Sequence, residues 1–375
     1  MSGKTFEEVK KNFGFGCMRL PLRKDGSIDD EQFCKMVDEF IAQGFNYFDT
    51  AHGYHEGESE KAIKRCLTSR HDRSEYTLTN KLTDPYFSKK EDIAPFVQSQ
   101  LELCGVDYFD FYLAHALNKR VYPQFVRCDA FNEMVKLKEA GKIHHIGISF
   151  HDDADFLEQI LKEQPAIEVV QIQFSYMDYE DSGVQSRKCY EICEKYGKPA
   201  IVMEPVRGGK LVNLPDNAKA VLDSLKGGSY ASYAIRFAAS YPNNFMTLSG
   251  MGDMDMMKDN LSYMKDFKPL SEVEKNAVFA VRDILNGLDT IPCTACRYCT
   301  ERCPKKILIP DLFSDYNAKI VFKDWNSDMY YANHTNQNGK ASDCIKCGLC
   351  EKSCPQKLPV RDLLDKVAST FEKKA

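Results

Sequence analysis

Short apolar segments rich in β-formers alternate with longer stretches of helical periodicity from about residue 12 to residue 265. The eight predicted strands cover residues 12–17, 46–49, 76–80, 109–114, 143–149, 169–173, 200–204 and 245–249. The clearest intervening helices cover residues 29–43, 57–69, 89–104 and 127–140. Asp29 is a suitable N-cap for the first of them and Gly44 a suitable stop. This alternation is typical of parallel strands joined by crossover helices.

The number of these units decides between two fold classes. Eight β/α units over about 250 residues match a (β/α)8 TIM barrel. A doubly wound sheet is the alternative, but it would need a Gly-x-Gly-x-x-Gly turn after its first strand, and Gly14-Phe-Gly16 does not continue that way. We therefore expect an α/β chain with a TIM barrel in residues 1–268. Residues 269–375 are expected to form a linker helix and a small, mainly helical iron–sulfur domain.

Composition excludes several classes of protein. The chain has 375 residues, a formal net charge of −5 and 43% hydrophobic residues. Its start lacks the apolar region of a signal peptide, and no run approaches the roughly 18 apolar residues of a membrane span. We expect a cytoplasmic protein with neither nucleic acid nor membrane as a partner. Seven scattered cysteines are predicted to be free thiols of a reducing compartment, namely Cys17, Cys34, Cys66, Cys104, Cys128, Cys189 and Cys193.

The residues after the barrel contain three further predicted segments. Residues 271–286 have the pattern of a helix that leads to the first of two cysteine motifs. Residues 325–342 are polar and lack a core pattern, so we expect a surface loop there. Residues 358–367 follow the second motif and have the pattern of an amphipathic helix.

The strongest functional pattern is a pair of C-x2-C-x2-C-x3-C-P runs, at residues 293–304 and 344–355. This is the spacing of bacterial ferredoxins, in which three cysteines hold one [4Fe-4S] cluster and the fourth reaches its neighbour. The first predicted cluster has the ligands Cys293, Cys296, Cys299 and Cys354. The second has the ligands Cys344, Cys347, Cys350 and Cys303. Zinc is the alternative, but it needs only four ligands and does not account for the repeated third cysteine and Cys-Pro pair. A disulfide scaffold fits less well, since nothing else suggests secretion.

Polar residues also stand where predicted barrel strands end, which is where TIM-barrel active sites lie. Asp49 ends the second strand, and Tyr54 follows it by five residues. Lys81 ends the third strand and His115 the fourth. Because these residues come from three adjacent units, they can converge on one site.

Three segments carry a resemblance to the aldo-keto reductase family: Phe48-Asp-Thr-Ala-His-Gly-Tyr54, Thr79-Asn-Lys81 and Asp107-Tyr-Phe-Asp-Phe-Tyr-Leu-Ala-His115. The cysteine runs and the opening Phe15-Gly-Cys-Met-Arg-Leu-Pro21 resemble its bacterial subgroup with a C-terminal [4Fe-4S] ferredoxin-type domain. The resemblance implies that Tyr54 is the proton donor and that Lys81 and Asp49 tune it. It also implies that His115 orients the carbonyl.

The same resemblance implies a nicotinamide site formed by Ser149, Gln171 and Met203. Phe150 and Met203 depart from the asparagine and stacking tyrosine of many members. The other expected cofactor-binding residues are Met18, Arg19, Arg207, Gly208, Gly209, Lys210, Ser249, Gly250, Met251, Gly252 and Asn260. A plain Gly-rich turn is the alternative for residues 207–210. Asp253 and Asp255, with only Lys258 nearby, leave NADPH against NADH open and favour NADH slightly by repelling an extra phosphate.

These features predict an oxidoreductase that reduces an aldehyde or ketone, or oxidises the alcohol, by hydride transfer from NADPH or NADH. Hydride transfer does not need a one-electron carrier, so the clusters need a separate explanation. One possibility is that the clusters relay electrons to a ferredoxin-like partner, through a flavin that converts single electrons to pairs, although no flavin motif is visible. Another is that the clusters serve structure or redox sensing. A third possibility is a regulatory or sensor protein with a slow barrel.

Overall fold

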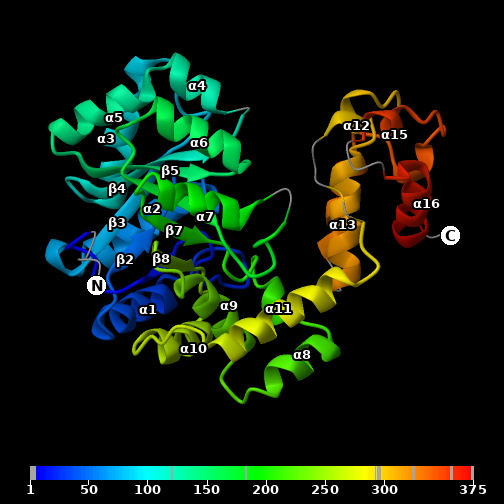
Figure 1. The fold of residues 1–375 in the computed structure, drawn as a ribbon. Helices are drawn as coiled ribbons and strands as arrows, with labels where there is room; N and C mark the ends of the chain where they lie inside the picture. The colour runs from blue at the N-terminus through cyan, green and yellow to red at the C-terminus, as the bar shows by residue number, and fades with distance from the viewer. Residues whose placement is uncertain are drawn as a thin grey trace. The chain divides into compact units, whose positions relative to one another are not determined.

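Eight parallel strands form a closed barrel in the computed structural model, in which each strand pairs with its neighbours in sequence and β8 pairs with β1 (Figure 1). The strands are β1 (Phe13–Gly16), β2 (Tyr47–Asp49), β3 (Thr77–Leu82), β4 (Phe109–Leu117), β5 (Ile143–Phe150), β6 (Val169–Gln173), β7 (Ala200–Met203) and β8 (Asn244–Ser249). The structure describes residues 6–119, 121–181, 184–291, 293, 297–322, 326–354 and 358–372. The predicted fold class is confirmed, and every predicted strand overlaps an observed one.

Helices surround the strands in the barrel part of Figure 1. The α-helices up to residue 264 are α1 (Asp30–Ala42), α2 (Glu58–Ile63), α3 (Ile93–Cys104), α4 (Tyr122–Arg127), α5 (Ala130–Glu139), α6 (Ala154–Glu163), α7 (Ser186–Lys195), α8 (Asp216–Asp223), α9 (Tyr230–Ala239) and α10 (Met254–Met264). Short helical turns are η1 (Tyr54–Gly57), η2 (Lys64–Thr68), η3 (Arg73–Glu75), η4 (Lys90–Asp92) and η5 (Lys210–Val212). Asp29 caps α1 by accepting a hydrogen bond from the Gln32 amide at 3.2 Å, and Gly44 follows with a φ of +83°. The N-cap at the start of α1 and the glycine after its end were both predicted correctly.

The C-terminal helices are α11 (Glu272–Asn286), α12 (Tyr298–Glu301), α13 (Ile309–Phe322), α14 (Asn326–Thr335), the turn η6 (Ala341–Asp343), α15 (Leu349–Ser353) and α16 (Val360–Phe371). The chain divides into two compact units. One unit comprises Met1–Val212 with Gly227–Asn276, and the other comprises Asn213–Lys226 with Ala277–Ala375. The predicted domain boundary at residue 268 remains a prediction. In the part of the chain that the structure describes, no helix is long and apolar enough to cross a membrane.

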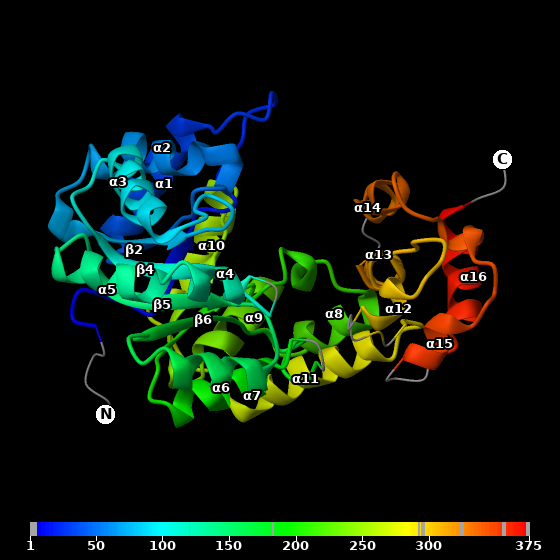
Figure 2. The ribbon, with the colours of Figure 1, turned by 90° about the horizontal axis from the view of Figure 1, so that it is seen from above.

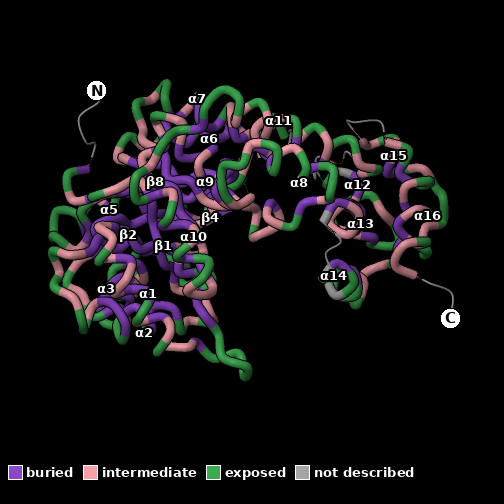
Figure 3. Tube along the Cα trace, turned by 90° about the horizontal axis from the view of Figure 1, so that it is seen from below, coloured by how far each residue is buried: buried purple, intermediate pink, exposed green. Residues whose placement is uncertain are grey.

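Buried residues concentrate along the barrel strands, which appear purple in Figure 3. The amino-terminal segment adds to this core, since Phe6 packs against Phe111 and Phe245 with ring centroids 5.0 and 4.9 Å apart. The interior leaves no room for a side chain at Gly147, where a Cβ would lie 2.5 Å from Leu113. The packed interior makes the barrel a rigid support for residues at the strand ends.

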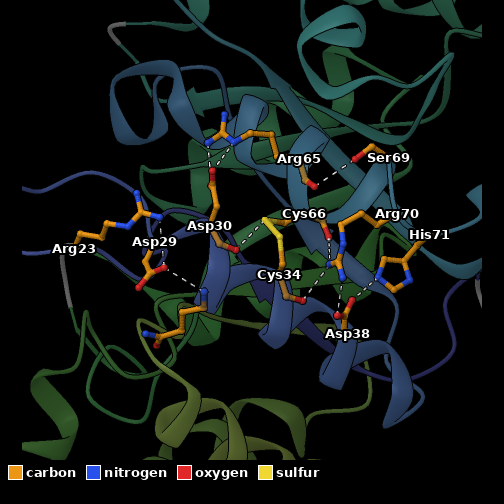
Figure 4. Close-up of a disulfide and its surroundings, with 11 residues drawn as sticks. Arg23, Asp29, Asp30, Cys34, Asp38, Arg65, Cys66, Ser69, Arg70 and His71 are labelled. Carbon is orange, nitrogen blue, oxygen red and sulfur yellow. Dashed lines mark hydrogen bonds and ion pairs between the residues drawn. A yellow bond between two sulfur atoms is a disulfide. The ribbon is translucent and has the colours of Figure 1, made fainter.

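Cys34 of α1 and Cys66 of η2 form a disulfide (Figure 4). Next to it, Arg70 donates hydrogen bonds to the backbone carbonyls of both cysteines and pairs with Asp38 at 2.8 Å. The expectation of free thiols is therefore wrong for these two residues, because the fold brings together positions 32 residues apart that no local spacing links. Cys17, Cys104, Cys128, Cys189 and Cys193 are free and buried, as expected.

The C-terminal unit is built from short helices that pack on one another, with α14 and α16 both against α13 (Figures 1 and 2). The expected surface loop at residues 325–342 is wrong for most of its length, because residues 326–335 form α14, whereas Trp325 lies outside the described residues. Tyr331 anchors this polar helix by stacking on Phe371, with ring centroids 4.5 Å apart. Its hydroxyl also accepts a hydrogen bond from the Ala341 amide. One anchor of this kind leaves no periodic apolar signal in the sequence.

Candidate active site and cysteine motifs

Three of the four predicted catalytic residues form one hydrogen-bonded group at the carboxyl ends of the barrel strands. The fully buried Lys81 ammonium donates to Asp49 Oδ1 at 2.5 Å and to the Thr50 carbonyl at 2.8 Å. It also donates to the Tyr54 hydroxyl at 3.3 Å. The phenol of Tyr54 is therefore held next to an ammonium group whose two other hydrogen bonds go to Asp49 and Thr50.

A turn of unusual backbone conformation holds Tyr54 in this position. His55 and Glu56 have φ values of 51° and 56°, and Gly57 follows with 90°. Left-handed conformations of non-glycine residues cost free energy, so other contacts must fix the turn. One such contact is the hydrogen bond from the Leu20 amide to His55 Nε2 at 3.0 Å, which ties the turn to the segment after β1.

Burial and charge determine the protonation states in this group. Burial raises the pKa of the Tyr54 phenol, and the lowering effect of Lys81 does not cancel it, so the phenol is protonated at neutral pH. Burial lowers the pKa of Lys81, but attraction by Asp49 and Tyr54 outweighs it and the net pKa is raised. The site thus presents a proton donor beside a permanent positive charge.

His115 lies within β4 and faces Tyr54, with ring centroids 6.1 Å apart. A hydrogen bond of 2.7 Å joins its Nδ1 to the Thr83 hydroxyl. Burial and the nearby Lys81 hold the pKa of His115 well below its usual value, so this imidazole is neutral. A neutral ring anchored through Nδ1 leaves Nε2 to interact with a substrate oxygen.

His151 is a second neutral histidine at this end of the barrel, and the sequence analysis did not select it. It directly follows β5, and its Nε2 lies 3.4 Å from the hydroxyl of the predicted nicotinamide ligand Ser149. Burial and Lys81 lower its pKa to about 4. Its position one residue past a strand was a usable signal, since residues at strand ends form such sites.

The sequence analysis also missed a buried glutamate behind Lys81. Glu60 of α2 is fully buried, and its carboxylate accepts hydrogen bonds from Asn80 at 2.8 Å and Gln100 at 3.1 Å. A further hydrogen bond of 2.7 Å joins it to His52. Gln100 in turn donates to the Lys81 carbonyl at 3.2 Å. This network fixes the β3 backbone that carries Lys81, and no local spacing marks it in the sequence.

Some predicted cofactor-binding residues lie together around Arg19. Arg19 pairs with Glu204 at 3.5 Å. A Cβ added to Gly208 would lie 2.9 Å from the Arg19 guanidinium, and one added to Gly250 would lie 3.2 Å from its Cβ. The segment after β7 and the segment after β8 therefore both approach Arg19 closely. Small residues beside a cation are suited to a phosphate group of a nucleotide.

The other predicted cofactor residues have varied surroundings. Ser249 and Asn260 are buried and bonded to each other at 2.8 Å, and Met251 is buried. Gln171 is buried and donates to Asp49 at 3.1 Å, so it supports the Lys81 group. Arg207 lies 3.4 Å from the buried Asp178, which offsets its charge. The remaining positions are Met18, which is exposed, Ser149, which is buried, and Met203, Gly209, Lys210 and Gly252, which are partly buried.

The four cysteines assigned to the second cluster line one pocket in the C-terminal unit. Its lining residues are Cys303, Pro304, Lys305, Ile307, Ile309, Cys344, Ile345, Cys347, Gly348, Leu349, Cys350 and Leu364. Cys303 comes from the first motif and joins three cysteines of the second, as the exchange of the fourth ligand requires. No three His, Cys, Asp or Glu side chains among the described residues are placed to hold a single metal ion.

The two motifs also share a backbone feature. The residue after the second cysteine is left-handed in both copies, with φ values of 64° at Arg297 and 73° at Gly348. Each of these residues precedes a short helix that carries the third cysteine, Cys299 or Cys350. For the first predicted cluster, Cys293, Cys299 and Cys354 are described, while Cys296 lies outside the described residues.

A closed parallel barrel with polar groups at its strand ends has the architecture of a TIM-barrel enzyme, and comparisons with known proteins give its family. Residues 12–282 match the model of the aldo/keto reductase family, and residues 292–359 match that of a 4Fe-4S dicluster domain. The chain therefore belongs to the aldo/keto reductase family and carries a 4Fe-4S dicluster domain at its C-terminal side.

Individual relatives are distant. An uncharacterized oxidoreductase of Bacillus subtilis, YqkF, is 25% identical over 67% of this chain and 78% of its own. The NADH-specific methylglyoxal reductase of Escherichia coli is 26% identical over 50% of this chain and 60% of its own.

Solved structures show the same fold. An aldo-keto reductase of Bacillus halodurans in its holo form has a TM-score of 0.59 at 22% identity, covering 72% of this chain and 92% of its own. One from Klebsiella pneumoniae in complex with NADPH has a TM-score of 0.58 at 18% identity, covering 73% and 90%.

Proposed function

We propose that the barrel reduces an aldehyde or ketone with NADH or NADPH, with Tyr54 as the proton donor. The observation that carries this proposal is the Tyr54 phenol held 3.3 Å from the buried Lys81 ammonium, which is itself bound to Asp49. The nicotinamide, when bound, would supply the hydride. The chain's own residues then have to bind and orient the carbonyl, and deliver one proton to its oxygen.

Each residue of the group has one part in that proton transfer. Tyr54 gives its proton to the developing alkoxide. Lys81 stabilises the phenolate that remains, since its ammonium is within hydrogen-bond distance, and Asp49 holds Lys81 charged and in place. His115, neutral and fixed by Thr83, directs Nε2 toward the carbonyl oxygen and aligns it with Tyr54.

Residues around Arg19, with Gly208 and Gly250, would hold the phosphates of the nucleotide, and Ser149 with Met203 would border the nicotinamide. Asp253 is engaged in capping α10, because its carboxylate accepts a hydrogen bond from the Met256 amide at 2.8 Å. Asp255 is exposed, and its charge would repel the additional phosphate group that distinguishes NADPH from NADH. We therefore expect NADH to be the preferred nucleotide, and the Escherichia coli relative with an NADH-specific reductase name supports this choice.

The cysteine motifs would hold two [4Fe-4S] clusters, with Cys293, Cys296, Cys299 and Cys354 on one and Cys344, Cys347, Cys350 and Cys303 on the other. The pocket that gathers the second set supports this assignment. Such clusters, when bound, exchange single electrons. We propose that they connect the protein to a one-electron partner.

Two measurements test these proposals. Methylglyoxal and a panel of aldehydes and ketones, assayed with NADH and with NADPH, should reveal turnover that Tyr54→Phe abolishes and Tyr330→Phe, at an exposed site, does not. An anaerobic titration with each nucleotide, followed by absorbance and EPR, should bleach the iron–sulfur bands if nicotinamide and clusters exchange electrons. Turnover on no carbonyl would contradict the reductase proposal, and nucleotide binding without bleaching would contradict electron exchange with the nicotinamide.

A further inference from the structure

The second cysteine motif has an open side that carries large apolar residues. In the second motif Cys347 is exposed, and two apolar neighbours that line the same pocket, Ile345 and Leu349, are 57% and 40% exposed. The third cysteine is buried in both motifs, Cys299 in the first and Cys350 in the second, and the counterpart of Cys347 in the first motif lies outside the described residues. At the position of Gly348 the first motif has Arg297, whose guanidinium makes two hydrogen bonds to Asp311 at 2.8 and 2.7 Å. The second motif therefore presents Cys347 and two large apolar side chains to the surface.

Charge around this opening differs from the chain as a whole. Residues 301–306 carry three exposed cations, Arg302, Lys305 and Lys306, against one acid, Glu301. Lys305 lines the pocket, and neither it nor Lys306 forms an ion pair with any residue that the structure describes. Two of the nearby acids already have ion-pair partners: Glu351 pairs with Arg361 at 2.8 Å, and Asp365 pairs with Lys346. A chain of net charge −5 thus has a local positive excess beside the exposed Cys347.

We propose that Ile345, Cys347, Leu349, Lys305 and Lys306 form the docking surface for an acidic one-electron carrier protein of the ferredoxin type. This inference rests on the proposed two-cluster function and names the partner and face of the second cluster site. Exposed apolar side chains give such a contact its desolvated centre, while unpaired lysines at the rim steer an acidic partner by long-range attraction. A carrier seated here would have its redox group close to Cys347, so electrons would cross a short distance.

The test is binding of the purified two-cluster protein to a small acidic ferredoxin, measured by calorimetry at low and high ionic strength. The affinity should fall as salt is raised, and the double variant Lys305→Glu/Lys306→Glu should weaken it about tenfold or more at low salt. The matched control Lys24→Glu/Lys188→Glu reverses two exposed lysines of the barrel unit and should leave the affinity unchanged. Ile345→Ser/Leu349→Ser should weaken binding at both salt concentrations, because it removes the apolar contact.

Iron content of each variant shows whether its clusters are intact, and Lys305→Gln/Lys306→Gln gives a milder second test if charge reversal prevents cluster assembly. No binding by the wild-type protein, or equal binding by the wild type and either lysine variant, would overturn the proposal. Self-association that depends on the same lysines would also overturn it, in favour of a second copy of this chain. Carbonyl reduction is measured separately on the wild-type protein and on all variants. A wild-type protein that reduces carbonyls but does not bind the ferredoxin rejects only the docking surface, and one that binds the ferredoxin without turnover rejects only the reductase.

Discussion

In the barrel, side chains complete one another's interactions: Lys81 donates to Asp49, Thr50 and Tyr54, while Gln171 donates to the second oxygen of Asp49. In the C-terminal unit, by contrast, free cysteines from two motifs line a common pocket. The first site is organised by the protein's own side chains, whereas the second would be completed by the proposed cluster. Substitutions should therefore affect the two sites through different quantities, namely rate and stability in the barrel and metal content in the cysteine motifs.

Replacing Tyr54 by Phe tests the barrel site most directly. We expect kcat for carbonyl reduction to fall by about 10²–10⁴-fold, because the proton donor is lost while the barrel remains folded. Nucleotide affinity, measured by fluorescence quenching, should be unchanged. A variant that retains most of the wild-type kcat would show that another group supplies the proton.

Replacing Lys81 by Met tests whether the barrel site also stabilises the fold. The buried Asp49 would lose its cation, which should lower the free energy of unfolding by about 3–5 kcal/mol in a denaturant titration. Lys81→Met combined with Asp49→Asn should recover much of that loss, because no isolated charge remains. The exposed Lys162, paired with Glu158, is the control, and its change to Met should cost less than about 1 kcal/mol. Equal losses for Lys81→Met and the double variant would contradict this account.

Replacing Cys347 by Ala should affect metal content without disabling the barrel. One of the two predicted clusters loses a ligand, so iron and acid-labile sulfide per chain should fall to about half. Cys128→Ala removes a free cysteine outside both motifs and should leave iron unchanged. Carbonyl reduction should persist in both variants. Full iron content in Cys347→Ala would show that this cysteine is not a ligand.

The smallest expected effect is that of pH on the reduction rate. The pKa of Tyr54 is raised above its ordinary 10.0, so its proton is lost only in alkali beyond that value. The pKa of His115 lies well below 6.5, so this imidazole becomes charged only in acid. The kcat for reduction should therefore stay level between about pH 6.5 and 10. A clear titration within this window, in a full pH profile of kcat, would contradict the assigned protonation states.

Local sequence signals predicted the barrel well because strand and helix periodicity, caps and glycine stops act over a few residues. Asp29 and Gly44 delimit α1 as expected, and β6 was predicted to the residue. Failures occurred where the deciding contact is distant in sequence. The disulfide between Cys34 and Cys66 depends on two helical segments meeting, and α14 is held by Tyr331 against Phe371, 40 positions away.

The sequence by itself determined the fold class, the two cysteine motifs and the convergence of Asp49, Tyr54 and Lys81, because strand ends of adjacent parallel units must meet at one edge. Only the tertiary structure decided which charged side chains have buried partners and which cysteines are exposed. It placed Glu60 behind Lys81, Gln171 on Asp49 and Asp178 beside Arg207, and it left Cys347 exposed while burying Cys350. Burial and long-range pairing set pKa values and accessibility, and these depend on every element packed around a group rather than on its neighbours along the chain.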